Sequence, residues 1–398
     1  EMASRQQHML LLLSLSCFVC WIGGAEAWSD DYNILSEFYR ATNGSDWFVK
    51  NGWLDGEPCE ETRSSSSWFG VQCEGTHVYS INLQLNNLSG YIPHSMADLP
   101  SLVALGIFQN NVGGTIPEAF GRMRTLHTLF LSGNRITGTI PSTFDGTGCE
   151  DLQVLSLFNN ELTGTIPENL GFQFHLRSLD LYNNQLSGTI PESLGLFYDM
   201  DALQLFNNSL TGTIPESIGG MAGMRVLSLA VNQLEGTVPG AFWKLQQLEN
   251  LYLQQNNLEG TLPDQMGALH NLGSLYLFDN NFSGTLPDSM GQLRKLQYVY
   301  LNNNQFEGTL PESWGETCPT LLNLGNNSLS GTIPESFGDC TGIVGFYMND
   351  NHLSGALPDF LVTAPDFFVD VRNNELTCPL PRWCSSLGSG YCEPCAFA

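Results

Sequence analysis

Apolar and polar positions follow one another along this chain in a unit that repeats about every 24 residues. Residues 152–167 show the unit clearly, as L-x-x-L-x-L-x-x-N-x-L-x-G-T-I-P. The alternation Leu155-Ser156-Leu157 is the pattern of a short strand with one buried face. A Gly-Thr-Ile-Pro-like tetrapeptide ends each unit and recurs twelve times, and nine of the eleven intervals between its prolines are 24 residues. A fixed period of this length predicts a solenoid, with one turn of coil per unit.

An asparagine lies four residues before the glycine of every unit, from Asn86 to Asn351, and Asn374 adds a thirteenth. Each turn bends sharply after its strand, which leaves backbone N–H and C=O groups inside the coil. A side-chain amide can donate to and accept from such groups in its own turn and in the adjacent turn. We therefore expect these asparagines to be structural.

The leucines and isoleucines are expected to stack turn on turn into one continuous core, so both ends of the array need caps. The expected fold is α/β, a horseshoe-shaped solenoid of about 12–13 turns. It should have a parallel concave sheet, a second short sheet and convex 3-10 turns. Residues 28–78 are expected to form the N-terminal cap, 79–377 the repeat array and 378–398 a cysteine-rich C-terminal cap.

Residues 1–27 are typical of a secretory signal peptide, with Arg5, a short apolar run over 10–22 and the small-residue site Ala25-Glu26-Ala27. No later segment is long and apolar enough to span a bilayer. We therefore expect a secreted, extracellular protein that is not inserted in a membrane. In that compartment most cysteines should form disulfides, and Cys149 is the one expected to remain free. The expected disulfide cysteines are Cys59, Cys73, Cys318, Cys340, Cys378, Cys384, Cys392 and Cys395.

The repeat resembles the plant-type leucine-rich repeat, whose hallmark is L-x-G-x-I-P. Residues 68–73, Trp-Phe-Gly-Val-Gln-Cys, resemble the N-terminal cap motif of that family, W-x-G-V-x-C. Its members include plant receptor-kinase ectodomains, polygalacturonase-inhibiting proteins and secreted proteins of algae and protists. The resemblance covers residues 30–395 and implies a leucine-rich-repeat fold with a recognition or structural role, but it names no ligand. The C-terminal segment departs from the family, because four cysteines fall within 18 residues there.

The charge of the chain limits the partners it can have. The formal net charge is −26 at pH 7, which disfavours nucleic acid and anionic membranes. The histidines are scattered over separate units without metal-ligand spacing, and no phosphate loop or nucleophile motif accompanies them. We expect no enzymatic activity, no cofactor and no metal. An acidic residue follows most of the repeat prolines, as in the first turn of a helix, where a carboxylate meets the positive end of the dipole.

Five N-glycosylation sequons occur, and each asparagine in them is a candidate glycan site. They begin at Asn43, Asn87, Asn207, Asn281 and Asn326.

Counting back from the repeat glycine, the outward strand positions lie eight and six residues earlier, and aromatic residues fill many of them. The first column contains Phe130, Tyr252, Tyr276, Tyr300 and Tyr347, and the second contains Phe108, Phe158, Tyr182, Phe206 and Phe278. An aromatic strip bordered by amides suits stacking on sugar rings or holding an extended peptide. Our hypothesis is therefore recognition of an extracellular peptide, protein or glycan. The alternative is that the rings only stack on one another and stiffen the sheet.

A second candidate surface is the residue after each repeat glycine, which is expected to point outward from the second sheet. Ten consecutive units hold threonine there: Thr115, Thr139, Thr165, Thr189, Thr213, Thr237, Thr261, Thr285, Thr309 and Thr332. If these threonines lie side by side about 4.8 Å apart, they form a regular ladder. Such a ladder resembles the ice-binding faces of some antifreeze proteins, so ice binding is an alternative function. A third hypothesis is inhibition of a secreted cell-wall hydrolase. The oligomeric state is not predicted.

Overall fold

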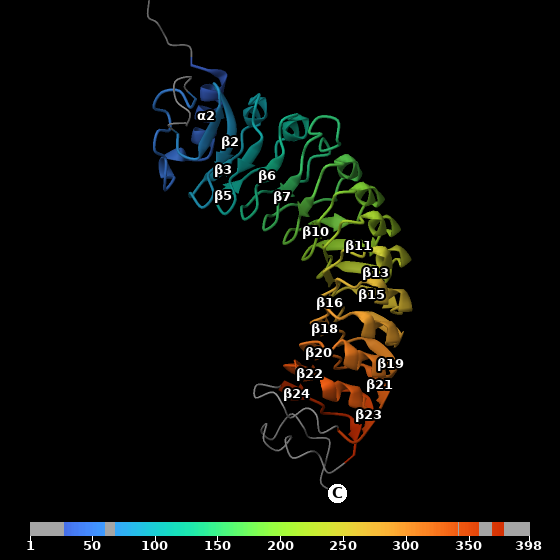
Figure 1. Ribbon diagram of the computed structural model, residues 1–398. Helices are drawn as coiled ribbons and strands as arrows, with labels where there is room; N and C mark the ends of the chain where they lie inside the picture. The colour runs from blue at the N-terminus through green and yellow to red at the C-terminus, as the bar shows by residue number, and fades with distance from the viewer. Residues whose placement is uncertain (1–27, 60–67, 341, 358–367, 378–398) are drawn as a thin grey trace, which may run out of the picture.

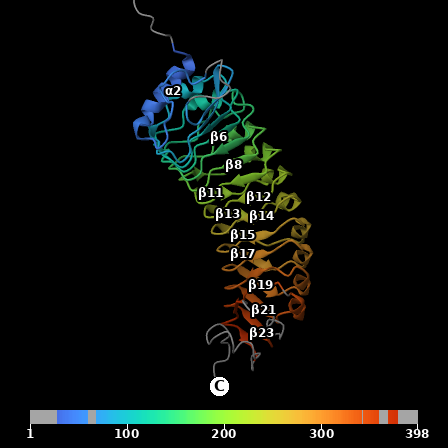
Figure 2. The ribbon, with the colours of Figure 1, turned by 60° about the vertical axis from the view of Figure 1, so that its left-hand side comes forward.

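The computed structural model describes residues 28–59, 68–340, 342–357 and 368–377. These residues form a coil of short strands and 3-10 helices that bends into an arc (Figure 1). The helical turns lie along the outer, convex side of the arc, and the strands of the largest sheet lie along its inner side. A view turned by 60° shows that the successive turns stack one on the next along the coil (Figure 2). The predicted solenoid, with its two sheets and convex 3-10 turns, is confirmed.

The concave sheet has fourteen strands within the described residues, and every pairing in it is parallel except that of β1 with β2. Consecutive turns pair in register 23 to 26 residues apart, so that Leu203 lies beside Leu179 and Leu227. The strands are β1 (Val71–Glu74), β2 (His77–Asn82), β4 (Ala104–Gly106), β6 (Thr128–Phe130), β7 (Val154–Ser156), β8 (Ser178–Asp180), β10 (Ala202–Gln204), β12 (Val226–Ser228), β14 (Asn250–Tyr252), β16 (Ser274–Tyr276), β18 (Tyr298–Tyr300), β20 (Leu321–Asn323), β22 (Gly345–Tyr347) and β24 (Phe368–Asp370).

A second sheet runs beside the concave one and is interrupted near its N-terminal end. In the described chain it consists of a nine-stranded part and a separate pair, β3 with β5. The strands are β3 (Ser89–Tyr91), β5 (Asn111–Gly113), β9 (Ser187–Gly188), β11 (Ser209–Thr213), β13 (Gln233–Thr237), β15 (Asn257–Gly260), β17 (Asn281–Thr285), β19 (Gln305–Thr309), β21 (Ser328–Gly331), β23 (His352–Gly355) and β25 (Glu375–Leu376).

The convex side is made of short 3-10 helices, most of which begin right after a repeat proline. Glutamate or aspartate occupies the first turn of most of them, as predicted. One of these carboxylates also joins turns, because Glu216 accepts the Ala241 N–H at 2.9 Å. The helices are η1 (Gly44–Asp46), η2 (His94–Asp98), η3 (Glu118–Arg122), η4 (Glu168–Phe172), η5 (Glu192–Leu196), η6 (Glu216–Gly220), η7 (Gly240–Lys244), η8 (Asp264–Ala268), η9 (Asp288–Gln292), η10 (Glu312–Glu316) and η11 (Glu335–Asp339).

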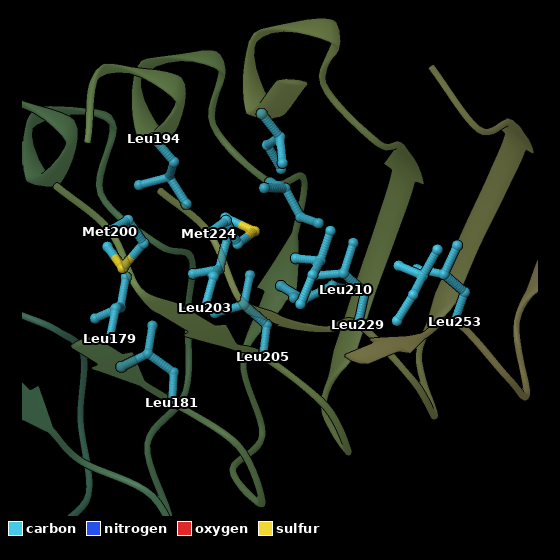
Figure 3. Packing of buried hydrophobic residues seen from close by; sticks show 14 of the residues in the cluster. Leu179, Leu181, Leu194, Met200, Leu203, Leu205, Leu210, Met224, Leu229 and Leu253 are labelled. Atoms are coloured by element: carbon cyan, nitrogen blue, oxygen red, sulfur yellow. The ribbon is translucent and has the colours of Figure 1, made fainter. Parts of the chain in front are cut away.

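One continuous apolar core fills the space between the sheets and the convex helices. Figure 3 shows Leu194, Met200 and Leu203 pointing into this space from different sides of one turn. All three are fully buried. Because each turn repeats the same pattern, its leucines pack on those of the turns before and after it. Burying each such side chain stabilises the fold by about 1.5–3 kcal/mol.

The asparagine column is structural, as predicted. Asn256 donates to Leu229 O (3.0 Å) in the preceding turn and to Leu253 O (3.1 Å) in its own turn. Its Oδ1 accepts the N–H of Leu234 at 3.0 Å. The same contacts recur from Asn110 to Asn374. Each asparagine therefore pairs backbone groups that the bend after the strand leaves without a partner in the coil.

The N-terminal cap consists of α2 (Asp30–Ala41), η1, and strand β1. Ser29 begins the helix by accepting the N–H of Tyr32 at 3.0 Å. Trp47, Trp53 and Trp68 are buried beneath the helix and contact one another in series, with ring centroids 4.8 Å apart at each step. This cluster closes the apolar end of the core.

The cysteine predictions are confirmed where the structure describes them. Disulfides join Cys59 to Cys73 and Cys318 to Cys340. Cys149 is free and buried, and burial raises the pKa of its thiol to about 12. The predicted signal peptide (1–27) and the C-terminal cap with Cys378, Cys384, Cys392 and Cys395 lie outside the described residues. No helix in the described part of the chain is long and apolar enough to cross a membrane.

Candidate functional site

The concave face presents three outward columns, because residues two apart on a strand share a face. We call the last residue of each concave strand the first column and the residue two places later the second column. The first residue of each three-residue strand from β4 onward forms a third column. All ten predicted aromatic residues lie in the first two columns; nine are half-buried, and Phe130 is 36% exposed.

The N-terminal part of the face carries a parallel stack of rings in the second column. Phe158 and Tyr182 lie 4.3 Å apart at an interplanar angle of 9°, and Tyr182 and Phe206 lie 4.3 Å apart at 11°. We call these three residues the ring stack. Phe108 and Phe130 make a separate edge contact at 6.2 Å. The spacing of the stack is slightly below the strand spacing, which fits the contraction of the concave side.

The C-terminal part carries a row of tyrosines in the first column. Tyr252, Tyr276 and Tyr300 occupy paired positions on consecutive strands, which confirms the predicted register. Their rings are 5.0 Å and 4.6 Å apart, and Phe278 contacts the row at 6.1 Å from Tyr300. Burial raises the pKa of both Tyr276 and Tyr300. Tyr347 lies two strands further on, beyond Asn323.

Two amide oxygens flank Phe278 along the second column without a hydrogen-bond partner. They are Oε1 of Gln254 in the preceding turn and Oδ1 of Asn302 in the following turn, and both are buried. Buried acceptors without a partner are uncommon in folded proteins.

The charged residues on or beside the concave strands have different surroundings. Asp370 is buried and paired with Arg372, whose Nε donates to it at 2.9 Å. Asp350 is exposed and accepts the side-chain amides of Asn349 and Asn373, which lower its pKa. Asp180, on β8, is half-buried beside the ring stack.

The sequence missed two features of this face. Tyr298 is 39% exposed in the third column, next to the tyrosine row. Tyr298 lies ten residues before the repeat glycine Gly308, a position that the two predicted columns do not include. The other feature is a ladder of side-chain amides along the edge of the sheet, where Asn207 donates to Asn183 at 2.7 Å and Asn183 donates to Asn159.

The threonine face differs from the prediction in its register. All ten threonines are exposed, as expected. However, neighbouring strands of the second sheet are shifted by two residues. Each threonine therefore pairs with the residue just before the repeat glycine of the next turn, and not with the next threonine. Thr115 therefore pairs with Thr137, and Thr213 pairs with Glu235. The predicted side-by-side ladder with a 4.8 Å spacing is wrong, because the shift places successive threonines diagonally.

The five sequon asparagines are all exposed. Asn207 and Asn326 belong to the edge ladder of amides, and each donates to the asparagine of the preceding turn. Their glycosylation stays a prediction. Among the residues that the structure describes, no group of three or more His, Cys, Asp or Glu side chains is placed to hold a metal ion.

Comparisons with known proteins match the repeats directly. A family model described as a leucine rich repeat matches residues 199–258. A second model of the same description matches six separate units, at residues 125–146, 151–172, 175–197, 271–293, 295–316 and 319–340. A search of curated proteins finds no significant match.

Solved structures with similar folds include plant receptor ectodomains. The PEPR1–AtPEP1 complex is 28% identical over 89% of this chain and 53% of that one, with a TM-score of 0.76. The Arabidopsis receptor kinase HAESA, in complex with the peptide hormone IDA and the co-receptor SERK1, is 32% identical over 87% of this chain and 58% of that one, with a TM-score of 0.77. A plant ice-binding protein is 26% identical over 77% of this chain and 88% of that one, with a TM-score of 0.56.

This chain spans a little over half the length of those receptor chains. The matched repeats and the two parallel sheets agree with one another. The chain contains leucine-rich repeats, and its fold is the leucine-rich-repeat solenoid that the plant receptor ectodomains share.

Proposed function

We propose that this chain is a secreted, non-enzymatic recognition protein whose concave face binds an extended segment of an extracellular peptide or protein. The observation that carries the proposal is the pair of aromatic clusters in register on that face, bordered by amides. Similar ectodomains have been solved with peptide hormones bound, which supports a peptide or protein ligand over a glycan.

The geometry of the rings suits this role. The rings contact one another at 4.3–5.0 Å and are half-buried, so their positions are set before a ligand arrives. Fixed aromatic side chains offer contact area at a low cost in conformational entropy. The contacts also stiffen the sheet, so ring stacking and ligand binding are compatible roles for the same residues.

The test is the simultaneous change of Tyr252, Tyr276 and Tyr300 to alanine. Binding is measured on an array of twelve-residue peptides and, in parallel, on an array of plant and algal oligosaccharides. We expect the native chain to bind a subset of the peptides and the variant to lose them. The matched control is the change of Thr237, Thr261 and Thr285 to alanine on the second sheet, which should leave binding intact.

Circular dichroism must show that both variants remain folded. Equal peptide binding by the tyrosine variant and the native chain would contradict the proposal, as would binding only to oligosaccharides. Loss of the half-buried ring contacts should lower the melting temperature, so stability alone does not decide the question.

Ice binding is a second candidate, because a fold match includes a plant ice-binding protein and the threonine face has an uncharged part. Between Thr115 and Thr213 the residues directly before and directly after each repeat glycine are all threonine or serine. In later turns Glu235, Glu259 and Glu307 occupy the position before the glycine and bring negative charge to this face. The test is ice recrystallisation inhibition by the native chain and by a Thr139→Lys/Thr165→Lys/Thr189→Lys variant. A native chain without effect removes this candidate. No contact in the described residues singles out a hydrolase, so the inhibitor hypothesis stays a prediction.

A further inference from the structure

Asp180 stands apart from the other charged residues of the concave face. In the turns from Ala104 to Ala230, all of which the structure describes, it is the only charged side chain in the three outward columns. It lies at the end of β8, two residues before Tyr182, the middle ring of the stack. Its neighbours across the sheet are Ser156 and Gln204.

The carboxylate of Asp180 is held by neutral groups. Gln204 Nε2 donates to Oδ1 at 2.9 Å, and Ser178 Oγ donates to Oδ2 at 3.1 Å. Within the described residues, no lysine, arginine or histidine forms an ion pair with it. Burial raises the pKa of Asp180 despite the two hydrogen bonds. A half-buried anion without a cation costs folding free energy.

The comparison with Asp370 shows what is missing at Asp180. Asp370 has the equivalent position at the end of β24, and Arg372, two residues later, pairs with it. At Asp180 the residue two places later is Tyr182, so the chain supplies a ring where the other turn supplies a guanidinium. A cation that pairs with Asp180 would therefore have to come from another molecule.

We propose that Asp180 and the ring stack form the anchoring site for a cationic group of the ligand, an ammonium or a guanidinium. This inference rests on the proposed function, since it specifies the ligand of the same face. The carboxylate supplies the opposite charge, and the half-buried rings beside it exclude water from the pair. Lysine, arginine and a free peptide N-terminus all carry suitable groups.

The probe is a peptide array in which each twelve-residue arginine peptide has a partner with citrulline, a neutral group of nearly the same shape. Further pairs compare lysine with acetyl-lysine and free with acetylated N-termini, which distinguishes the three sources of cation. Binding is measured at about 0.15 M salt, so that the overall negative charge is screened beyond about 8 Å. We expect the native chain to prefer the charged member of one kind of pair.

The decisive variant is Asp180→Asn, and Asp350→Asn is its control because it changes the net charge equally at an exposed site. Loss of a charge-assisted hydrogen bond should weaken binding of the charged peptide by roughly tenfold to a hundredfold in Asp180→Asn. The control should retain its affinity, and Asp180→Glu, which keeps the charge, should retain part of it. Equal effects of the two asparagine variants would overturn the inference.

Stability provides an independent readout. The raised pKa means that the ionised carboxylate is disfavoured in the folded chain, and this cost is present above the folded-state pKa and disappears as the pH falls through it. Tyr182 is the titratable neighbour that interacts with this carboxylate among the described residues, and it is neutral near pH 7 because its pKa is raised. Asp180→Asn should therefore melt no lower than the native chain at pH 7. A clear destabilisation would indicate a structural role instead.

These outcomes separate the two proposals. Peptide binding without a preference for charge, or without an effect of Asp180→Asn, overturns the anchoring site and leaves the proposed function standing. No peptide binding by the native chain overturns the proposed function itself.

Discussion

In most turns, one residue besides the repeat glycine takes a backbone conformation that most side chains avoid. The residue just before the buried asparagine has a positive φ, and in most turns it is Asn, Asp or Gln. Short polar side chains tolerate the left-handed region better than others. The exceptions are Leu85, Gly133 and Val231, and of these only Val231, with a φ of 54°, has a branched Cβ. It also interrupts the edge ladder of amides, which reaches Asn207 in the turn before it.

We predict that Val231→Asn stabilises the chain by about 1–2 kcal/mol, the usual cost of the left-handed conformation. The new amide would also be placed to donate to Asn207, as Asn207 does to Asn183. The matched control is Val344→Asn, because Val344 is likewise exposed but is not among the residues with a positive φ. Urea unfolding monitored by circular dichroism measures both. An equal or lower midpoint for Val231→Asn than for the native chain would contradict the prediction.

The sequence could predict the role of the buried asparagines, because their spacing placed them at the bend after each strand. It did not reveal the left-handed column, although asparagine recurs there too. The burial of Asp180 could not be read from the sequence either, since it depends on the side chains of Ser178, Gln204 and the neighbouring rings. The same periodicity that fixed the columns says nothing about which charges a turn leaves unpaired.

Most turns contribute one strand to the concave sheet and one to the second sheet, and the two sheets differ in how neighbouring strands are aligned. The concave strands pair in register, so columns read from the sequence are columns in the structure. The strands of the second sheet are shifted by two residues from one turn to the next. The predicted threonine ladder failed for this reason. A repeat pattern gives the spacing of equivalent residues along the chain but not the shear between turns.

The convex helices pack so closely that a glycine is required between some of them. A Cβ added to Gly195 in η5 would lie 2.4 Å from the Cβ of Ser217 in η6 and 2.5 Å from its carbonyl oxygen. Neither atom is the end of a flexible side chain. The glycine is therefore needed for space, and its φ is not positive.

We predict that Gly195→Ala destabilises the chain by about 1–3 kcal/mol through overpacking. Gly220→Ala is the control, because it lies in the same kind of helix and its added Cβ would be 3.6 Å from the nearest atom, Gly195 O. Thermal unfolding should show a lower midpoint for the first variant only. Similar midpoints for the two variants would show that η5 and η6 can move apart without cost.

At the scale of the whole molecule, carboxylates and aromatic side chains lie on different faces. The carboxylates that follow the repeat prolines lie on the convex side, and Glu235, Glu259 and Glu307 lie on the second sheet. The concave face is nearly uncharged and carries the aromatic columns instead. The arc turns this face inward (Figure 1). A bound segment can therefore touch rings from several turns at once.

The last prediction concerns the energetic coupling between turns of the continuous coil. Each turn contacts only its neighbours, so the stability of the array should be a sum of local terms. Asn232 and Asn256 in adjacent turns share an acceptor, since both donate to Leu229 O, at 3.1 Å and 3.0 Å. Asn134 is four turns before Asn232 and shares no partner with it.

Each single change to alanine should destabilise the chain by about 1–3 kcal/mol, because it leaves buried backbone groups unpaired. The double change of Asn232 and Asn256 should deviate from additivity by at least about 0.5 kcal/mol, because losing the first asparagine already removes one donor from Leu229 O. The double change of Asn134 and Asn232 should be additive within about 0.5 kcal/mol. For each pair, denaturant unfolding of the native chain, the two single variants and the double variant gives the deviation from additivity. Coupling of the distant pair as strong as that of the adjacent pair would mean that the coil responds as one cooperative body rather than turn by turn.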